Sequence, residues 1–534
     1  MLKETIFIDP ELKWTSAPAD IDAAGEVGPL MGPASLVDRL VEAFQEAEVV
    51  YSHWKSNIDL DQATAGEIDL DLLVDRKSMA PALAVLAELG FKAAQARWGV
   101  HPPSICHYYG MDPISQELIH VHLFSRVLTG ESFVKSHLLP FEAMLLQNVY
   151  FVDGMRVASK PAELLLFTLR MFIKYGSLPD LLRVARKAKS VRKEALWLQD
   201  DGVSLPQALA LLPTYCPVID EALFLQCVKT LSGKSSLLKR IWLAQKVRRR
   251  LAAYTKHTPW MRLLAYGDLF WAELRRRLGP KRKNRVLQSG GALIAFVGAD
   301  ATGKSTLVSE SSRWLGQTFT VETVHLGKPP TSWVTAPINL ALALLRRMGS
   351  GDEEKGSPRA DEKYAQNADE SALVLHKFKG AASLPYALRS VALAWDRRRL
   401  ATRCRRQAAA GSLIVCDRYP SSTSGAMDSP RLAPATGRKS AVARLYNLLA
   451  GLEQAIYRQI PPPDIVLRLH VALETALQRN RERGGQDGEG YLAVRHRQSR
   501  AWQMPGTRYE FTIDTEQSLV DTLRSVKNSI WHSL

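Results

Sequence analysis

The chain has few cysteines and no long apolar run among its 534 residues. The five cysteines are odd in number and never stand at metal-ligand spacing, which argues against a disulfide framework and against a zinc site. No apolar run approaches the roughly 20 residues that a membrane-spanning helix needs. Residues 1–26 are acidic and lack the apolar core of a signal peptide. These absences predict a cytoplasmic protein.

The length and composition predict a globular protein with two or three domains, since a chain this long exceeds what one core usually serves. Apolar residues make up 46% and charged residues 23%, as in ordinary globular proteins. The sequence pattern indicates four zones: a Pro/Ala/Gly-rich tail over residues 1–34, a small α+β domain over 35–155, a helical connector over 156–285 and an α/β domain over 290–534.

The positive charge is concentrated in one part of the chain. The net charge is +16, and residues 233–285 contain sixteen Lys or Arg against two acidic residues, Asp268 and Glu273. Apolar residues are interleaved with the basic ones. Basic amphipathic helices of this kind can lie on anionic membranes or touch nucleic acid. We expect a solvated helical face with a basic linker. The alternative is contact with an anionic membrane surface, which would place the protein at the membrane periphery, and no specific nucleic-acid partner is predicted.

From residue 290 onward, strand-like and helix-like segments alternate. The apolar run LIAFV precedes a glycine loop and the helix-like STLVSESSRWLG, and further strands are predicted at VETVHLG, SLIVCDRYP and PDIVLRLHV. This alternation predicts a parallel sheet in a doubly wound fold. Two segments are expected to lack compact structure, namely the basic linker KRKNRVLQSGG and a polar, mobile insertion at residues 350–371.

The stretch GADATGKST fits the phosphate-binding pattern G-x-x-x-x-G-K-[ST]. Its glycines let backbone N–H groups wrap an anion, and the following helix directs its positive N-terminus at that anion. Lys304 would reach the β- and γ-phosphates of ATP, and Ser305 would ligate Mg²⁺. The residues predicted to bind ATP are Gly298, Ala301, Thr302, Gly303, Lys304, Ser305 and Thr306.

A second strand should bring polar groups to the same edge of the sheet. The strand LIVC ends at Asp417-Arg418-Tyr419, and its carboxyl end should face the crevice that holds the glycine loop. An aspartate there can hold Mg²⁺, and the adjacent arginine can grip a phosphate with two hydrogen bonds. An upstream helix carries Arg397 as a second arginine, next to Asp396, which could instead pair with Arg399 one turn further along.

In these motifs and in their order, residues 292–510 resemble the thymidylate kinase family of P-loop nucleotide kinases. GADATGKST resembles the family's phosphate loop, LAWDR its helix arginine motif, and CDRYPSS its DRY-plus-serines motif. The resemblance implies that Asp417 handles the metal and that Asp300 faces the phosphoryl acceptor. It also implies that Arg397 and Arg418 hold the acceptor's phosphate, with Tyr419 beside them in the substrate site.

The late strand and helix PDIVLRLHVALETALQRNRER resemble the part of that family that leads into an arginine-bearing lid. Arg479 and Arg483 are four residues apart, so a helix would put both on one face. Together with Arg481 or Arg495, they are the predicted residues that neutralise charge in the transition state. In so basic a protein, these arginines could equally form an idle surface face.

Two segments depart from the family. After the DRY motif the family has an aromatic–Gln pair that helps to recognise the base, whereas this chain reads SSTSGAMDSPRLAP. After the second strand the family has an Arg-Glu-Pro-Gly turn, whereas this chain has Leu326-Gly327-Lys328-Pro329. The resemblance therefore predicts a kinase whose acceptor is not strictly dTMP.

The N-terminal zone carries a second group of polar residues. Asp69 and Asp71 alternate along a predicted strand, and two carboxylates on one face can bind Mg²⁺ and direct α-phosphoryl transfer. Residues 50–125 resemble the core of the nucleotidyltransferase superfamily, with Lys55 in place of its usual glycine. His120 and His122 stand where a third carboxylate is expected. Three interpretations remain open. The domain is degenerate and binds a ligand or positions the kinase, it is active, or it resembles the superfamily by chance.

Taken together, the sequence predicts an α/β P-loop kinase domain after an α+β nucleotidyltransferase-like domain and a helical connector. The predicted reaction is transfer of the γ-phosphoryl group from Mg·ATP to a small nucleotide, phosphorylated or hydroxyl acceptor. Two alternatives remain open. One is an ATP-dependent switch or scaffold at a membrane or polysaccharide-assembly complex, and the other is nucleotidyl transfer by the N-terminal domain. A homodimer is also left open.

Overall fold

A computed structural model describes residues 34–96, 104–130, 135–176, 186–256, 285–338, 379–436, 440–484 and 489–534, with a few single positions between them. Residues 35–534 form one compact unit that contains two large sheets. The predicted N-terminal tail and the predicted insertion at 350–371 lie outside the described residues. Within the described ranges, no helix is both long and apolar enough to cross a membrane.

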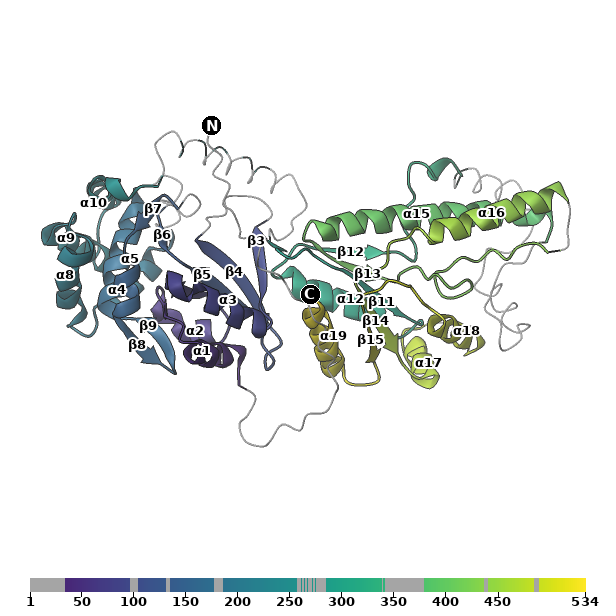
Figure 1. Cartoon of the computed structure of the whole chain (residues 1–534), viewed down its shortest axis with the longest axis horizontal. Helices are drawn as coiled ribbons and strands as arrows, with labels where there is room; N and C mark the ends of the chain where they lie inside the picture. The colour runs from purple at the N-terminus through teal and green to yellow at the C-terminus, as the bar shows by residue number, and fades with distance from the viewer. Residues whose placement is uncertain are drawn as a thin grey trace. The chain divides into compact units, whose positions relative to one another are not determined.

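The C-terminal part is built on a five-stranded, wholly parallel sheet (Figure 1). Its strands are β11 (Leu293–Gly298), β12 (Val321–His325), β13 (Leu413–Asp417), β14 (Ile465–His470) and β15 (Tyr509–Asp514). They lie in the order β12-β13-β11-β14-β15. The chain therefore places β12 and β13 on one side of β11, and β14 and β15 on the other. The point where the direction of winding changes is the carboxyl end of β11, where α/β sheets have their binding crevice.

Helices cover both faces of this sheet, which confirms the predicted doubly wound arrangement. Strand β11 shows it residue by residue. Ile294 and Phe296 lie in the core formed with α12 (Lys304–Gly316) and α19 (Leu519–Ser533). Leu293, Ala295 and Val297 lie in the core formed with α15 (Leu384–Ala409) and α16 (Ala441–Tyr457). Burial on both faces explains why the strand is a continuous apolar run. The remaining helices, α17 (Leu473–Glu482) and α18 (Glu489–Arg500), follow β14.

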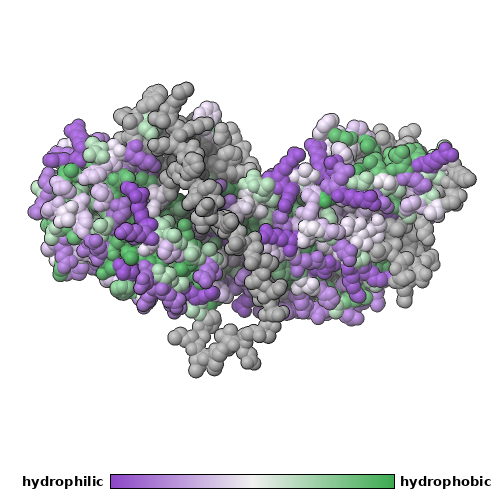
Figure 2. Space-filling model, in the orientation of Figure 1, coloured by the Kyte–Doolittle hydropathy of each residue, from purple (hydrophilic) through white to green (hydrophobic). Residues whose placement is uncertain are grey.

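Helices α15 and α16 also carry exposed apolar side chains on their outer surface. Leu445, Leu448 and Leu452 of α16 are 43–64% exposed, and Figure 2 shows hydrophobic residues gathered over this pair of helices. The three leucines repeat at helical spacing, so they form a single stripe.

The N-terminal part has an eight-stranded mixed sheet in the order β10-β3-β4-β5-β2-β1-β9-β8. The strands are β1 (Tyr51–His53), β2 (Leu70–Val74), β3 (Lys92–Ala96), β4 (Ile105–Met111), β5 (Leu118–Phe124), β8 (Val149–Val152), β9 (Met155–Ala158) and β10 (Arg285–Leu287). Helices α1 (Leu36–Glu46) and α3 (Met79–Glu88) pack on it in one apolar core. The expected α+β pattern of short strands and helices is thus present.

A helical bundle follows this sheet, as the sequence predicts. It consists of α5 (Lys160–Tyr175), α7 (Ala188–Trp197), α8 (Ser204–Tyr215), α9 (Glu221–Ser232) and α10 (Leu237–Arg250). Helix α5 begins with Pro161 in its first turn and is buried along nearly its whole length, because the other helices surround it. Short elements α2 (Leu60–Thr64), α4 (Glu142–Gln147), β6 (Val127–Thr129) and β7 (His137–Leu139) complete this part.

The expectation that KRKNRVLQSGG lacks compact structure is wrong for its central residues. Arg285–Leu287 form strand β10, which pairs antiparallel with β3. The same strand bonds to the C-terminal part: Thr320 N–H donates to the Arg285 carbonyl over 2.8 Å. The apolar pair Val286 and Leu287 is buried, which outweighs the basic residues around it.

The chain then passes very close to the end of α15, and this requires a glycine. A Cβ at position 291 would lie 1.9 Å from the Ser412 carbonyl oxygen, so the backbone itself would have to move. We predict that Gly291→Ala lowers the free energy of unfolding by about 1–3 kcal/mol, as overpacking does. Urea denaturation measures this.

Gly316→Ala is the matched control, because a Cβ at that position, in the last turn of α12, meets open space. It should leave stability unchanged or raise it by up to about 1 kcal/mol. Equal effects of the two substitutions would contradict the close approach at Gly291.

Candidate active site at the carboxyl edge of the parallel sheet

The glycine loop has the predicted strand–loop–helix setting, between β11 and α12. Gly303 is the N-cap residue of α12 and has φ 83°, a conformation that glycine adopts without strain. Ala301 also has positive φ, at 63°, although it carries a Cβ. The loop therefore turns sharply and leaves the first N–H groups of α12 directed toward the crevice, where they can bind an anion.

Lys304 is folded back over its own loop. Its Nζ donates to the Gly298 carbonyl over 3.0 Å and also to the Ala299 carbonyl. Burial, helped by the nearby Arg418, lowers the pKa of Lys304 to about 8. The two carbonyls hold the ammonium group beside the loop. A phosphate bound there would attract the ammonium group more strongly than these neutral carbonyls do, because the phosphate is charged.

Asp417 meets the first turn of α12 because β13 pairs with β11 in parallel. The register places Asp417 beside Phe296, and Ser305 Oγ donates to Asp417 Oδ2 over 3.5 Å. The other oxygen, Oδ1, is buried and has no hydrogen-bond partner among the residues that the structure describes. A hydroxyl and a carboxylate with an uncompensated oxygen suit Mg²⁺, which prefers oxygen ligands. The predicted metal pair is therefore brought together.

Asp300, between the two glycines of the loop, is held by two arginines. Arg418 Nη2 and Arg495 Nε bond to its two oxygens, the latter over 2.8 Å. Burial alone would raise the pKa of Asp300, but Arg495 and Arg418 outweigh it and lower the pKa to about 2. Arg495 lies on α18, so this contact joins the loop to the predicted lid region.

Arg397 is almost fully buried and makes only internal contacts in this structure. It donates to the Leu326 carbonyl over 3.0 Å and the Gly327 carbonyl over 2.8 Å. It also bonds to Asp428 Oδ1 over 2.8 Å and to the Tyr457 hydroxyl. Its contact with an acceptor phosphate stays a prediction. The structure shows that it fixes the segment after β12 to the segment after β13.

Asp428 is a site residue that the sequence reasoning missed. Its carboxylate is buried, bonds to Arg397 and lies 3.6 Å from Arg418 Nη1. Burial opposes ionisation, but Arg397 and Arg418 keep the pKa of Asp428 below its usual value. It stands in SSTSGAMDSPRLAP, where no motif marks it. The sequence feature that could have indicated it is that Asp428 is the one acidic residue of this segment, downstream of Arg397 and Arg418.

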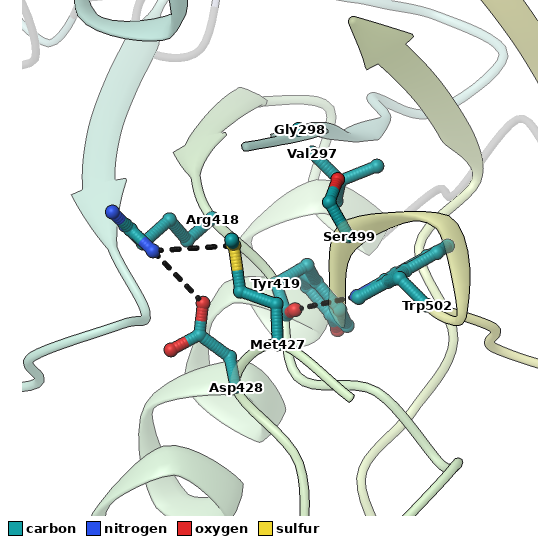
Figure 3. Close-up of a pocket in the computed structure, with 8 residues that line it drawn as sticks. All are labelled: Val297, Gly298, Arg418, Tyr419, Met427, Asp428, Ser499 and Trp502. Atoms are coloured by element: carbon teal, nitrogen blue, oxygen red, sulfur yellow. Dashed lines mark hydrogen bonds and ion pairs between the residues drawn. The ribbon is translucent and has the colours of Figure 1, made fainter. Parts of the chain in front are cut away.

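A small pocket lies beside the loop, and Figure 3 shows the Arg418 guanidinium directed at the Asp428 carboxylate in its wall. Gly298, Met427, Ser499 and Trp502 complete much of its wall. Tyr419 is buried with its hydroxyl donating to the Pro461 carbonyl over 2.6 Å. Trp502 Nε1 donates to the Tyr419 carbonyl over 2.8 Å. Tyr419 thus forms part of the wall.

Of the predicted lid arginines, the structure brings Arg495 to the loop. Arg479 instead donates to the Thr515 carbonyl over 2.6 Å, and Arg483 is the exposed C-cap residue of α17. The suggested pairing of Asp396 with Arg399 is wrong. Asp396 accepts from Thr335 Oγ1 over 2.7 Å and from Ser332 N–H over 3.2 Å, so it fixes the turn after β12.

The N-terminal carboxylates lie beside histidines on three neighbouring strands. Strand register places Asp71 beside His122, and His122 beside His107. Asp71 Oδ1 lies 2.8 Å from Lys55 Nζ and 3.2 Å from His122 Nδ1. Asp69, just before β2, bonds to His120 over 2.6 Å. Each predicted metal carboxylate is thus already in contact with a cation or imidazole of the protein.

These contacts set the protonation of the N-terminal group. Burial raises the pKa of Asp71, but the Lys55 ammonium outweighs it and holds the pKa below its usual range. Burial lowers the pKa of His122 to about 4, so it is neutral at pH 7. Within the described ranges, no set of three or more His, Cys, Asp or Glu is arranged to hold a metal ion. Metal binding by Asp69 and Asp71 stays a prediction.

Comparison with known proteins finds no family model that matches the chain. An uncharacterized ATP-binding protein YghR of Escherichia coli K12 is 27% identical over 191 residues, which is 35% of this chain and 68% of the relative. The protein of that name from E. coli O6:H1 matches equally. A deoxyadenosine kinase structure from M. mycoides with bound dATP covers 44% of this chain and 97% of its own, with 16% identity and a TM-score of 0.26. These likenesses do not assign the chain to a family.

The pKa of Asp300 predicts a pH-dependent contribution to stability. A carboxyl whose pKa is lowered on folding stabilises the protein above its unfolded pKa and loses that effect as the pH falls through the folded value. We predict that Asp300→Asn lowers the free energy of unfolding at pH 6 by about 2 kcal/mol. The difference from wild type should shrink between pH 4 and pH 2.5. Urea denaturation across this range measures it.

Asp61→Asn is the control, since Asp61 is an exposed residue of α2 with no ion pair among the described residues. It should match wild type throughout. A difference for Asp300→Asn that stays constant from pH 6 to pH 2.5 would contradict the ion pairs with Arg418 and Arg495.

Proposed function

We propose that residues 290–534 form a kinase that transfers the γ-phosphoryl group of Mg·ATP to a small-molecule acceptor. The observation that carries the proposal is the contact between Ser305, at the start of α12, and Asp417, at the end of β13, with one buried carboxylate oxygen uncompensated. The ATP-binding description of the E. coli relatives supports it.

On the donor side, the loop and the helix N-terminus bind the triphosphate. Backbone N–H groups of residues 301–306 surround the β- and γ-phosphates. Lys304 exchanges its bonds to the Gly298 and Ala299 carbonyls for phosphate oxygens. Ser305 and Asp417 would hold Mg²⁺, which neutralises developing charge on the phosphate oxygens when bound.

On the acceptor side, charged residues position the substrate and balance its charge. Arg418 and Asp300 face the crevice next to the loop, and Arg495 reaches it from α18. Arg418 binds the acceptor, Arg397 joins it by exchanging its internal bonds for bonds to the acceptor's phosphate, and Arg495 supplies positive charge as the phosphoryl group moves. Arg479 and Arg483 can join Arg495 in this role only if α17 moves from its present contacts. Asp428 keeps both acceptor arginines in place.

The acceptor is a nucleotide or another small phosphorylated or hydroxyl compound, and it is not strictly dTMP. The segment after β13 has no aromatic–Gln pair to read a base and instead contributes Met427 and Asp428 to the pocket. After β12, Lys328 and Pro329 stand where the Arg-Glu-Pro-Gly turn would be. The missing aromatic–Gln pair and the altered turn support an acceptor other than dTMP.

We predict that Lys304→Ala lowers γ-phosphoryl transfer by about 100-fold or more, as loss of one charge-stabilising group does in other enzymes. Incubation with γ-³²P-ATP and a panel of nucleotides, nucleosides, sugars and phosphosugars measures it. Label from α-³²P-ATP in a product would instead support nucleotidyl transfer by the N-terminal domain. ATP hydrolysis without any labelled acceptor would support a switch. Turnover of Lys304→Ala at the wild-type rate would contradict the kinase assignment.

A second variant tests the metal site. Asp417→Asn should raise the Mg²⁺ concentration needed for half-maximal activity at least about tenfold. Asp464→Asn is the matched control, because Asp464 precedes β14 at the opposite end of the sheet, where it bonds to Leu293 N–H and Arg405. It should lose stability and keep the wild-type Mg²⁺ dependence. Identical Mg²⁺ profiles for the two variants would rule out Asp417 as the metal residue.

A further inference from the structure

Helix α10 presents an exposed surface that combines apolar and basic side chains, here termed the α10 face. Leu238 is 79% exposed and Trp242 is 52% exposed, one helical turn apart. Leu237, the first residue of the helix, is 46% exposed. The basic members of the face are Lys239, Lys246 and Arg249, all exposed.

The orientation of this face is fixed by the opposite side of the helix. Leu243, Ala244 and Val247 are fully buried in the core that α10 shares with α5 and α9 (Figure 1). Arg240 and Arg248 reach along α5, where Arg240 bonds to the Tyr175 hydroxyl and Arg248 to the Ile173 carbonyl. The helix therefore cannot rotate to bury Leu238 and Trp242 without giving up this packing.

The charge of the α10 face is of one sign. Helix α10 contains no acidic residue, and its last turn is Arg248, Arg249 and Arg250. Arg250 pairs with Asp220 at 3.3 Å. Among the described residues, no carboxylate forms an ion pair with Lys239, Lys246 or Arg249. Lys246 Nζ lies 3.7 Å from the centre of the Trp242 ring, so the cation and the aromatic side chain face the solvent together.

We propose that the α10 face docks on an anionic lipid bilayer, with the helix lying along the surface. Basic residues are attracted to acidic headgroups, and Trp is a side chain of the membrane–water interface. Leu238 enters the boundary of the acyl chains, which removes its apolar surface from water. Nucleic acid would match the charge but offers a leucine no comparable apolar medium. The observations therefore favour a membrane.

The α10 face includes only a few residues of the basic window 233–285. In that window, α10 is a folded helix whose Leu243, Ala244 and Val247 lie in a protein core, and most of residues 257–284 lie outside the described residues. The proposal is independent of the kinase assignment, since it uses no residue of the active site.

The test is flotation of the full chain with vesicles of phosphatidylcholine alone and of phosphatidylcholine with 30% phosphatidylserine. We expect binding to the anionic vesicles only, weakened by salt. Lys239→Gln/Lys246→Gln/Arg249→Gln should weaken it at least about tenfold, since each charge contributes about a fivefold factor near such a surface. Leu238→Glu/Trp242→Glu should weaken it by a similar factor. Melting temperatures of all variants should stay near wild type, because the changed side chains are exposed.

Two control variants match these changes in number and kind on the C-terminal part. Arg399→Gln/Arg444→Gln/Arg458→Gln removes three exposed arginines, and Leu519→Glu/Val520→Glu changes two exposed apolar residues. Both should bind vesicles as wild type does. The proposal is overturned by absent binding, by equal binding to neutral vesicles, or by equal losses in the control variants. Binding to duplex DNA or RNA that depends on the three charges and not on Leu238 and Trp242 would also overturn it.

Discussion

The parallel pairing of β11 and β13 is the constraint on which the candidate site depends. Because the two strands run side by side in the same direction, their carboxyl ends reach the same edge of the sheet. Asp417 then lies against the first turn of α12, although 112 residues separate it from Ser305. The glycine loop and this carboxylate are brought together only through that pairing. Residues on both faces of β11 are buried, so the register cannot slip without exposing two cores.

Around this edge, buried and half-buried charges pair with one another. Asp300 binds Arg418 and Arg495, and Asp428 binds Arg397 and lies near Arg418. Isolated buried charges would be costly, so each is held by an opposite charge or by backbone carbonyls. Under the proposed function, a triphosphate and an acceptor would bring their own negative charge to the same place. In the proposed kinase, ligand binding would exchange internal ion pairs for contacts with substrate.

The sequence was sufficient for the parts of the fold that depend on local pattern. Apolar runs and glycine spacing predicted β11, β12, β13 and β14, the loop, and the pairing of a metal-type carboxylate with Ser305. It could not predict contacts that depend on tertiary register. Examples are β10, whose buried Val286 and Leu287 were hidden in a basic segment, and Asp428, which no motif marks. Among several arginines of similar spacing, only the placement of α18 distinguishes Arg495 from Arg479 and Arg483. Likewise, the contacts of Asp71 with Lys55 and His122 depend on the order of strands in the N-terminal sheet. Spacing along the chain does not reveal that order.

Ser305 and Asp417 are proposed to create a Mg·ATP site beside the glycine loop. Isothermal titration calorimetry with a non-hydrolysable ATP analogue tests it most directly, performed once with Mg²⁺ and once with the metal chelated. We expect one nucleotide to bind per chain and its affinity to fall strongly when Mg²⁺ is removed. Absence of binding, or binding of the same strength without the metal, would contradict it.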